Sequence, residues 1–164
     1  MPIKLIRIDD RYIHGQVTVS WVNHYRINEI WVVDDKIATN PVLKQLQLAL
    51  APPNVVVKIL SVKEAIEEAK KSDKNPNNIM IITPNAVIAL RLIKEGNIKI
   101  DWINAGQSAW NPGKIILVKS FAASQDDINA FKELHAMGIK IIYQMLANES
   151  PQDLIEILKK KGLL

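Results

Sequence analysis

The chain has 164 residues, 48% of them hydrophobic and 23% charged, which fits one globular domain spanning residues 1–164 with a single core. It contains no cysteine, which excludes disulfide bonds and thiol catalysis and fits a reducing, cytoplasmic setting. A formal net charge of +4, spread along the chain, favours an acidic partner surface over nucleic acid.

The N-terminal segment MPIKLIRIDD predicts a short strand that ends in acidic residues. A secretory signal peptide would continue with an apolar region at this point, so the segment does not fit one. Apolar runs elsewhere stay well below the roughly 18 residues that a membrane-spanning helix needs.

Apolar runs of strand length alternate with segments of helical spacing along the whole chain. Runs of this kind are typical of strands buried on both faces, and regular alternation with helices predicts parallel pairing with right-handed crossovers. We therefore expect an α/β fold, an open doubly wound, mainly parallel sheet of six or seven strands with helices on both faces. The expected strands are residues 3–8, 29–34, 55–60, 79–83, 100–104, 114–118 and 139–143.

Ligands of such sheets bind beyond the carboxyl ends of the strands, so the segment after the first strand is a candidate site. Residues 7–16, RIDDRYIHGQ, place His14 and two aspartates at this point. A histidine ring nitrogen can act as a nucleophile near neutral pH. Asp9 or Asp10 could hold the other ring nitrogen and fix its tautomer.

Three further residues of this segment favour an anion. Arg11 carries a permanent charge with a planar fork that suits phosphate oxygens. A helix should begin near Gly15 and Gln16, where free N–H groups attract negative charge and glycine allows close approach. With Asp10, these residues are candidate contacts of a phosphoryl group carried by His14.

The same residue types have ordinary structural uses. A histidine at a strand–helix junction often caps the helix, and an Asp-Asp-Arg cluster can be a salt-bridged loop. His24 and His135 lie within predicted helices without such neighbours, and both are interpreted as structural. Residue types alone leave the phosphoryl site and the salt-bridged loop as open alternatives.

Other chemistries lack their motifs. A receiver domain needs an aspartate after the third strand, where this chain has Leu60 and Ser61. Nucleotide-binding loops of the G-x-x-x-x-G-K-[ST] or G-x-G-x-x-G type do not occur. Metal sites lack cysteine, and the three histidines are not spaced for one helix face.

A second polar loop, NAGQSAWNPGK at residues 104–114, should project from the same edge of the sheet. Gln107, Ser108 and Asn111 offer hydrogen bonds, and Trp110 offers an aromatic edge. Ser108 is a candidate phosphate contact, although an ordinary polar turn would have the same composition.

The motifs together identify a family. The chain resembles enzyme IIB subunits of the mannose/fructose/sorbose family of the bacterial sugar phosphotransferase system along nearly its whole length. The segments that carry the resemblance are RIDDRYIHGQV (7–17), IWVVDDKIATN (30–40), LAPPNV (50–55), DWINAGQSAWNPGK (101–114) and DDINAFKELHAMGIKI (126–141).

The resemblance implies a phosphocarrier. The family's phosphorylated histidine falls on His14, and its phosphate-loop arginine and aspartate fall on Arg11 and Asp9. A IIA protein or domain would donate the phosphoryl group, and a sugar entering through membrane IIC and IID subunits would accept it. The implied relay requires no metal, nucleotide or other cofactor and takes place on the cytoplasmic side, at the membrane transporter.

Two departures from the family pattern are visible. Where the family usually has two adjacent glycines, this chain has Ala105-Gly106-Gln107 with one glycine, so the backbone after the fifth strand could differ. Position 12 is tyrosine, where leucine is commoner in the family. A non-catalytic binding or regulatory module with the same fold stays the alternative function. The sugar, the phosphorylated ring nitrogen and the oligomeric state, including a homo-oligomer, are left open.

Overall fold

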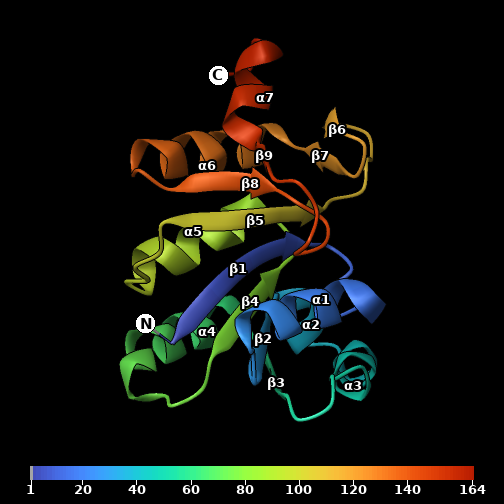
Figure 1. Ribbon diagram of the computed structural model, residues 1–164, viewed down its shortest axis with the longest axis vertical. Coiled ribbons are helices and arrows are strands. Elements are labelled where there is room, and N and C mark those ends of the chain that lie inside the picture. Colours follow the sequence, from blue (N-terminus) through green and yellow to red (C-terminus); the bar gives the residue numbers. More distant parts are fainter. Residues whose placement is uncertain (1) are drawn as a thin grey trace.

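The computed structural model describes residues 2–164, and Met1 lies outside the described residues. Within residues 2–164, seven strands form one sheet in the order β3-β2-β4-β1-β5-β8-β9 (Figure 1). All pairs are parallel except β8 with β9, which is antiparallel. The strands of this sheet are β1 (Ile3–Asp9), β2 (Glu29–Val33), β3 (Val56–Leu60), β4 (Ile79–Thr83), β5 (Trp102–Gln107), β8 (Lys140–Tyr143) and β9 (Gln152–Asp153).

Helices connect these strands and cover both faces of the sheet. In the view of Figure 1, α1 lies in front of the strands and α5 lies behind them. The helical segments are α1 (Gly15–Tyr25), α2 (Asp35–Ala38), α3 (Pro41–Ala49), α4 (Val62–Lys70), the 3-10 turn η1 (Ser72–Lys74), α5 (Ala86–Glu95), α6 (Gln125–Ala136) and α7 (Leu154–Lys160). The expected α/β architecture is confirmed.

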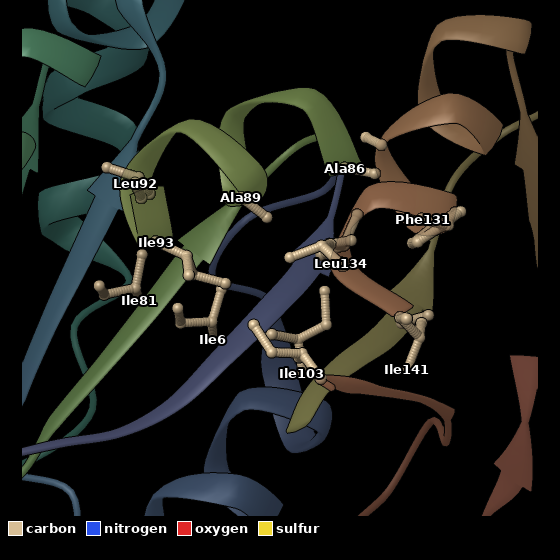
Figure 2. Packing of buried hydrophobic residues seen from close by; sticks show 14 of the residues in the cluster. Ile6, Ile81, Ala86, Ala89, Leu92, Ile93, Ile103, Phe131, Leu134 and Ile141 are labelled. Atoms are coloured by element: carbon tan, nitrogen blue, oxygen red, sulfur yellow. The ribbon is translucent and has the colours of Figure 1, made fainter. Parts of the chain in front are cut away.

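Strand β4 shows why the apolar runs are continuous. Ile79 and Ile81 face one hydrophobic cluster, whereas Met80 and Ile82 face a second cluster on the other side of the sheet. Successive side chains of a strand point to opposite faces, so a strand covered on both faces needs apolar residues at every position. Figure 2 shows the first cluster, in which α5 and α6 pack on the strands. Its labelled residues are Ile6, Ile81, Ala86, Ala89, Leu92, Ile93, Ile103, Phe131, Leu134 and Ile141.

Two expectations about the sheet are wrong in detail. The strand expected at 114–118 forms as β6 (Ile115–Val118), but it pairs antiparallel with β7 (Phe121–Ala123) in a separate two-stranded sheet. The short connection between β6 and β7 allows only a hairpin, because a parallel crossover needs a dozen or more residues. The fifth strand also runs further than the expected 100–104 and ends at Gln107, so part of the second polar loop is strand.

The carboxyl ends of β1, β5 and β8 meet at the right-hand edge in Figure 1. The loop between β1 and α1 leaves the sheet at this edge, and so do the segments after β5 and β8. The fold thus gathers the first candidate loop with two segments that follow it by about 100 and 130 residues in the chain.

Candidate functional site

The loop between β1 and α1 is fixed on one side to the end of β5. The backbone N–H of Asp10 donates to Gln107 O at 3.1 Å, and the Asp10 carboxylate accepts from the N–H of Ala109 at 2.7 Å. Ser108 is buried, and its hydroxyl accepts a hydrogen bond from Lys114 Nζ at 3.2 Å. Asp10 and Ser108 therefore have structural partners, and their contact with a phosphoryl group stays a prediction.

On its other side the loop is fixed to α2 and α3. Tyr12 adopts a left-handed conformation with φ of 61°, which turns its hydroxyl to donate a hydrogen bond to Asp34. The N–H of Ile13 donates to Gln47 Oε1 at 2.9 Å. The tyrosine that departs from the family pattern thus ties the loop to the segment after β2.

His14 is the N-cap residue of α1, with an extended backbone at φ of −155°. Its own N–H donates to Thr18 Oγ1 at 2.9 Å, and its side chain forms no capping hydrogen bond to the helix. The imidazole is 21% exposed, and Nε2 lies 2.8 Å from Asp9 Oδ2. No group in residues 2–164 forms a hydrogen bond with Nδ1, which leaves this nitrogen available to a ligand.

Asp9 is fully buried at the end of β1 and is the centre of the site. Its Oδ2 accepts from Arg7 Nε at 3.2 Å, Arg7 Nη2 at 3.0 Å and the His14 ring, while Oδ1 accepts from the N–H of Arg11 at 2.9 Å. Burial alone would raise the pKa of Asp9. The hydrogen bond to His14, the charge of Arg7 and the N–H of Arg11 outweigh burial and lower the pKa, so the carboxylate stays ionised.

Arg7 is 2% exposed, although it lies in an apolar strand. In addition to its bonds to Asp9, Arg7 donates from Nη1 to Asn104 Oδ1 and to Gln144 O. The guanidinium lies 5.9 Å from the ring centre of Trp21. It also lies directly against Gly106, where an added Cβ would stand 2.3 Å from Arg7 Cζ. The glycine that remains of the family's glycine pair is therefore required by the arginine packed on it.

Arg11 lies at the rim of the site with 48% of its side chain exposed. Its Nε is 3.8 Å from Asp9 Oδ1, and its Nη2 is 3.9 Å from Met145 Sδ. These contacts are long, so most of the guanidinium's hydrogen-bonding capacity is directed to solvent. Gly15, with φ of +45°, and the exposed Gln16 begin α1 beside it, and the first N–H groups of a helix lack acceptors within the helix.

The structure thus brings His14, Asp9 and Arg11 together as the sequence predicts, and it adds Arg7 and Asn104, which sequence reasoning missed. An arginine within an apolar strand was the available signal, because a charged side chain is rarely buried without a partner. Asn104 is fully buried, and its Nδ2 donates to Ile142 O and Gln144 O.

The surroundings of the site define what it can hold. The described residues contain no group of three or more His, Asp or Glu side chains able to hold a metal ion. A cavity of about 660 Å³ lies on the α1 side of the sheet, lined by Trp21, Tyr25 and Trp102 among others, but His14 does not line it. The imidazole is instead partly exposed at the surface, outside this cavity.

Comparison with known proteins decides the family. The family model described as "PTS system sorbose subfamily IIB component" matches residues 3–164. The chain belongs to this family. A sorbose-specific EIIB component of Klebsiella pneumoniae is 30% identical, over 95% of this chain and 94% of that protein. A fructose-specific EIIB component of Bacillus subtilis is 31% identical, over 97% of each chain.

Solved structures agree with the assignment to the IIB family. The IIBSor domain of the sorbose permease of Klebsiella pneumoniae matches with a TM-score of 0.94 and 29% identity over the full length of both chains. The mannose-specific EIIAB component of Escherichia coli K12 is 32% identical over 98% of this chain, which spans about half the length of that relative. None of the helices in the described part of the chain has the length and apolar character needed to cross a bilayer.

Proposed function

We propose that this chain is a phosphocarrier of a sugar phosphotransferase system, acting as one domain. His14 accepts a phosphoryl group from a phosphorylated IIA protein or domain and passes it to a sugar of the mannose/fructose/sorbose class. The sugar is taken up through membrane IIC and IID subunits, and the carrier works at their cytoplasmic face. The IIB family and the geometry around His14 support this proposal.

The contact between His14 Nε2 and Asp9 Oδ2, at 2.8 Å, carries the proposal. An ionised carboxylate can only accept a hydrogen bond, so it selects the imidazole form that bears its proton on Nε2. The lone pair then lies on Nδ1, the nitrogen without a protein partner. We therefore assign the phosphoryl group to Nδ1.

In the first transfer, the Nδ1 lone pair attacks phosphorus as the phosphorus–nitrogen bond of the donor phosphohistidine breaks. The electron pair of the broken bond returns to the donor ring. Since Nε2 keeps its proton, the His14 ring gains positive charge, which the Asp9 carboxylate stabilises. We expect the guanidinium of Arg11 and the first amides of α1 to bind the phosphoryl oxygens.

In the second transfer, a sugar hydroxyl oxygen attacks phosphorus and the bond to Nδ1 breaks. The electron pair returns to Nδ1, and the hydroxyl proton passes to solvent. Phosphoryl transfer depends mainly on positioning and charge stabilisation, which Asp9, Arg11 and the α1 amides would supply here. One half-exposed arginine binds the group moderately, as a carrier that must release it requires.

The names and lengths of the relatives support the choice of donor. The mannose-specific relative is named EIIAB, and this chain matches about half of it, which is consistent with a IIA unit in the same polypeptide there. In this system, a IIA protein or domain would reach His14 at the open edge of the sheet.

The test is transfer of radioactive phosphate from phosphoenolpyruvate, through the general phosphotransferase proteins and a cognate IIA, onto the purified chain. We expect the wild type to gain one acid-labile phosphate and His14→Ala to gain none. His135→Ala, which changes a histidine in the last turn of α6, is the matched control and should label fully.

Each outcome has a defined meaning. If His14→Ala labels as well as the wild type, the assigned site is wrong. If the wild type stays unlabelled with every IIA partner offered, the non-catalytic module replaces the phosphocarrier as the function. Nuclear magnetic resonance of the labelled protein distinguishes the Nδ1 from the Nε2 phosphate, and an Nε2 phosphate contradicts the role given to Asp9.

A further inference from the structure

We propose that Arg7 is a positioning residue of this site, acting through Asp9 to hold His14 as the neutral Nε2–H tautomer with Nδ1 directed to solvent. The consequence for phosphoryl transfer rests on the proposed function. The tautomer itself is a property of the unphosphorylated protein, so it can be measured whether or not the phosphocarrier role holds.

Arg7 and Asp9 meet in a geometry that orients the carboxylate. Nε and Nη2 of Arg7 both donate to Oδ2, the same oxygen that receives the His14 ring. The paired donors of a guanidinium fix the orientation of a carboxylate more firmly than one ammonium group can. Rotation of the Asp9 carboxylate would move the acceptor away from Nε2, so Arg7 on Oδ2, together with the Arg11 N–H on Oδ1, holds the acceptor against the imidazole.

Charge also connects Arg7 with Asp9. Asp9 is fully buried, and a buried carboxylate needs a compensating positive charge. Arg7 is the buried cation that supplies it, whereas Arg11 is half exposed and its nearest guanidinium atom is 3.8 Å from the carboxylate. Without Arg7, the His14 ring is the closest group able to supply the charge. It would do so by binding a second proton, which removes the lone pair that attacks phosphorus.

Arg7 itself is held in a fixed position. Nη1 is held by Asn104 Oδ1 and Gln144 O, and the guanidinium packs against Gly106. Trp21 lies within cation–π range, and its Nε1 donates to Met145 O, in the segment that follows β8. Groups from β5, α1 and the segment after β8 thus hold a side chain whose contact with the site runs through Asp9.

Two substitutions test the proposal from different directions. Arg7→Lys keeps a positive charge but cannot donate both to Asp9 and to Asn104 with the geometry of a guanidinium. Gly106→Ala keeps Arg7 and displaces it, because the new Cβ would stand 2.3 Å from its Cζ. Arg91→Lys is the matched control, since Arg91 pairs with Glu95 on the exposed face of α5.

The decisive measurement is nitrogen-15 nuclear magnetic resonance of the His14 ring at neutral pH, on protein shown to be folded by circular dichroism. We expect the neutral Nε2–H tautomer in the wild type and in Arg91→Lys. In Arg7→Lys and Gly106→Ala we expect a mixture of tautomers with some doubly protonated ring. Phosphorylation by phospho-IIA should slow about 10- to 100-fold in these two variants, as for loss of other orienting partners.

The proposal is overturned if wild-type His14 carries its proton on Nδ1. It is also overturned if a folded Arg7→Lys or Gly106→Ala variant keeps the wild-type tautomer, whatever its rate of phosphorylation. If one variant does not fold, the other decides. Failure of the phosphocarrier role would appear separately, as absence of label in the wild type while the tautomer stays as expected.

Discussion

Replacing Asp9 by asparagine removes the negative charge at the centre of the site and keeps the shape of the side chain. The asparagine oxygen could still accept from Arg7 and His14 in place of Oδ2, but the amide nitrogen would then face the N–H of Arg11. The opposite orientation would place the amide nitrogen against the donors of Arg7. Either way two donors confront each other, and the buried guanidinium loses its counter-ion.

Removing one partner of a buried ion pair lowers the free energy of unfolding by roughly 3–5 kcal/mol, because the remaining charge stays buried without compensation. A chain of this length loses about 2–4 °C of melting temperature per kcal/mol, so we expect a decrease on the order of 10 °C at pH 7. Asp10→Asn is the matched control, because the Asp10 carboxylate accepts one backbone hydrogen bond at the rim and should cost only about 1 kcal/mol.

The contribution of Asp9 to the free energy of unfolding should depend on pH. The pKa of Asp9 is lower in the folded protein than the value of about 3.9 for an unfolded aspartate, because hydrogen bonds and the charge of Arg7 outweigh burial. The stability that Asp9 contributes is therefore fully present above that value and is lost as pH falls through the folded-state pKa. Wild type and Asp9→Asn should differ most at neutral pH and converge in acid.

Denaturant unfolding followed by circular dichroism between pH 3 and pH 7 measures this difference. Phosphorylation of folded Asp9→Asn should be slowed at least about 100-fold, because the charge forming on the His14 ring loses its support. An unfolding free energy within about 1 kcal/mol of the wild type at pH 7 would refute the account of the buried pair.

Two further substitutions separate chemistry from stability. Arg11→Gln at the half-exposed rim should change stability by no more than about 0.5 kcal/mol and slow phosphorylation about 10²- to 10³-fold, and an unchanged rate in rapid-quench experiments would remove Arg11 from the site. Glu29→Gln at the opposite end of the sheet should destabilise the fold by about 2–4 kcal/mol and leave the phosphorylation rate of folded protein unchanged. Burial alone would raise the pKa of Glu29, but its partners lower it, so its contribution is present above about pH 4.3 and lost in acid. Denaturant unfolding on both sides of about pH 4.3 measures this stability contribution. Slower phosphorylation of folded Glu29→Gln would contradict the claim that Glu29 acts on stability alone. The partners of the Glu29 carboxylate are Trp31, Asn75, Asn77 and Lys58.

The fold was largely predictable because its strands are buried on both faces. Runs such as residues 79–82 need apolar side chains at every position, and that pattern is visible without knowledge of the partners. Residues 115–118 have the same apolar character, yet two of them, Ile115 and Ile116, are exposed in the β6–β7 hairpin. Composition alone does not separate a strand of the central sheet from a hairpin outside it.

The site was predictable only where its residues are close in sequence. His14, Asp9 and Arg11 lie within six positions, so one loop contained them all. Arg7 is two residues from Asp9, but what makes it part of the site is Asn104, nearly 100 residues away. A contact of that separation depends on the order of strands in the sheet, in which β1 lies beside β5.

In the proposed relay, the two arginines around Asp9 would have different tasks, one holding the histidine and the other binding the phosphoryl group. Arg7 is buried and saturated with protein acceptors, so its charge is already balanced by Asp9 and contributes little attraction for a second anion. Arg11 makes only long side-chain contacts and keeps its donors for a ligand. If both guanidinium groups were free at the surface, a phosphoryl group on His14 would be bound more tightly and released more slowly. In the proposed relay, the burial of Arg7 would thus limit how strongly the site holds a phosphoryl group, which is the condition for passing it on.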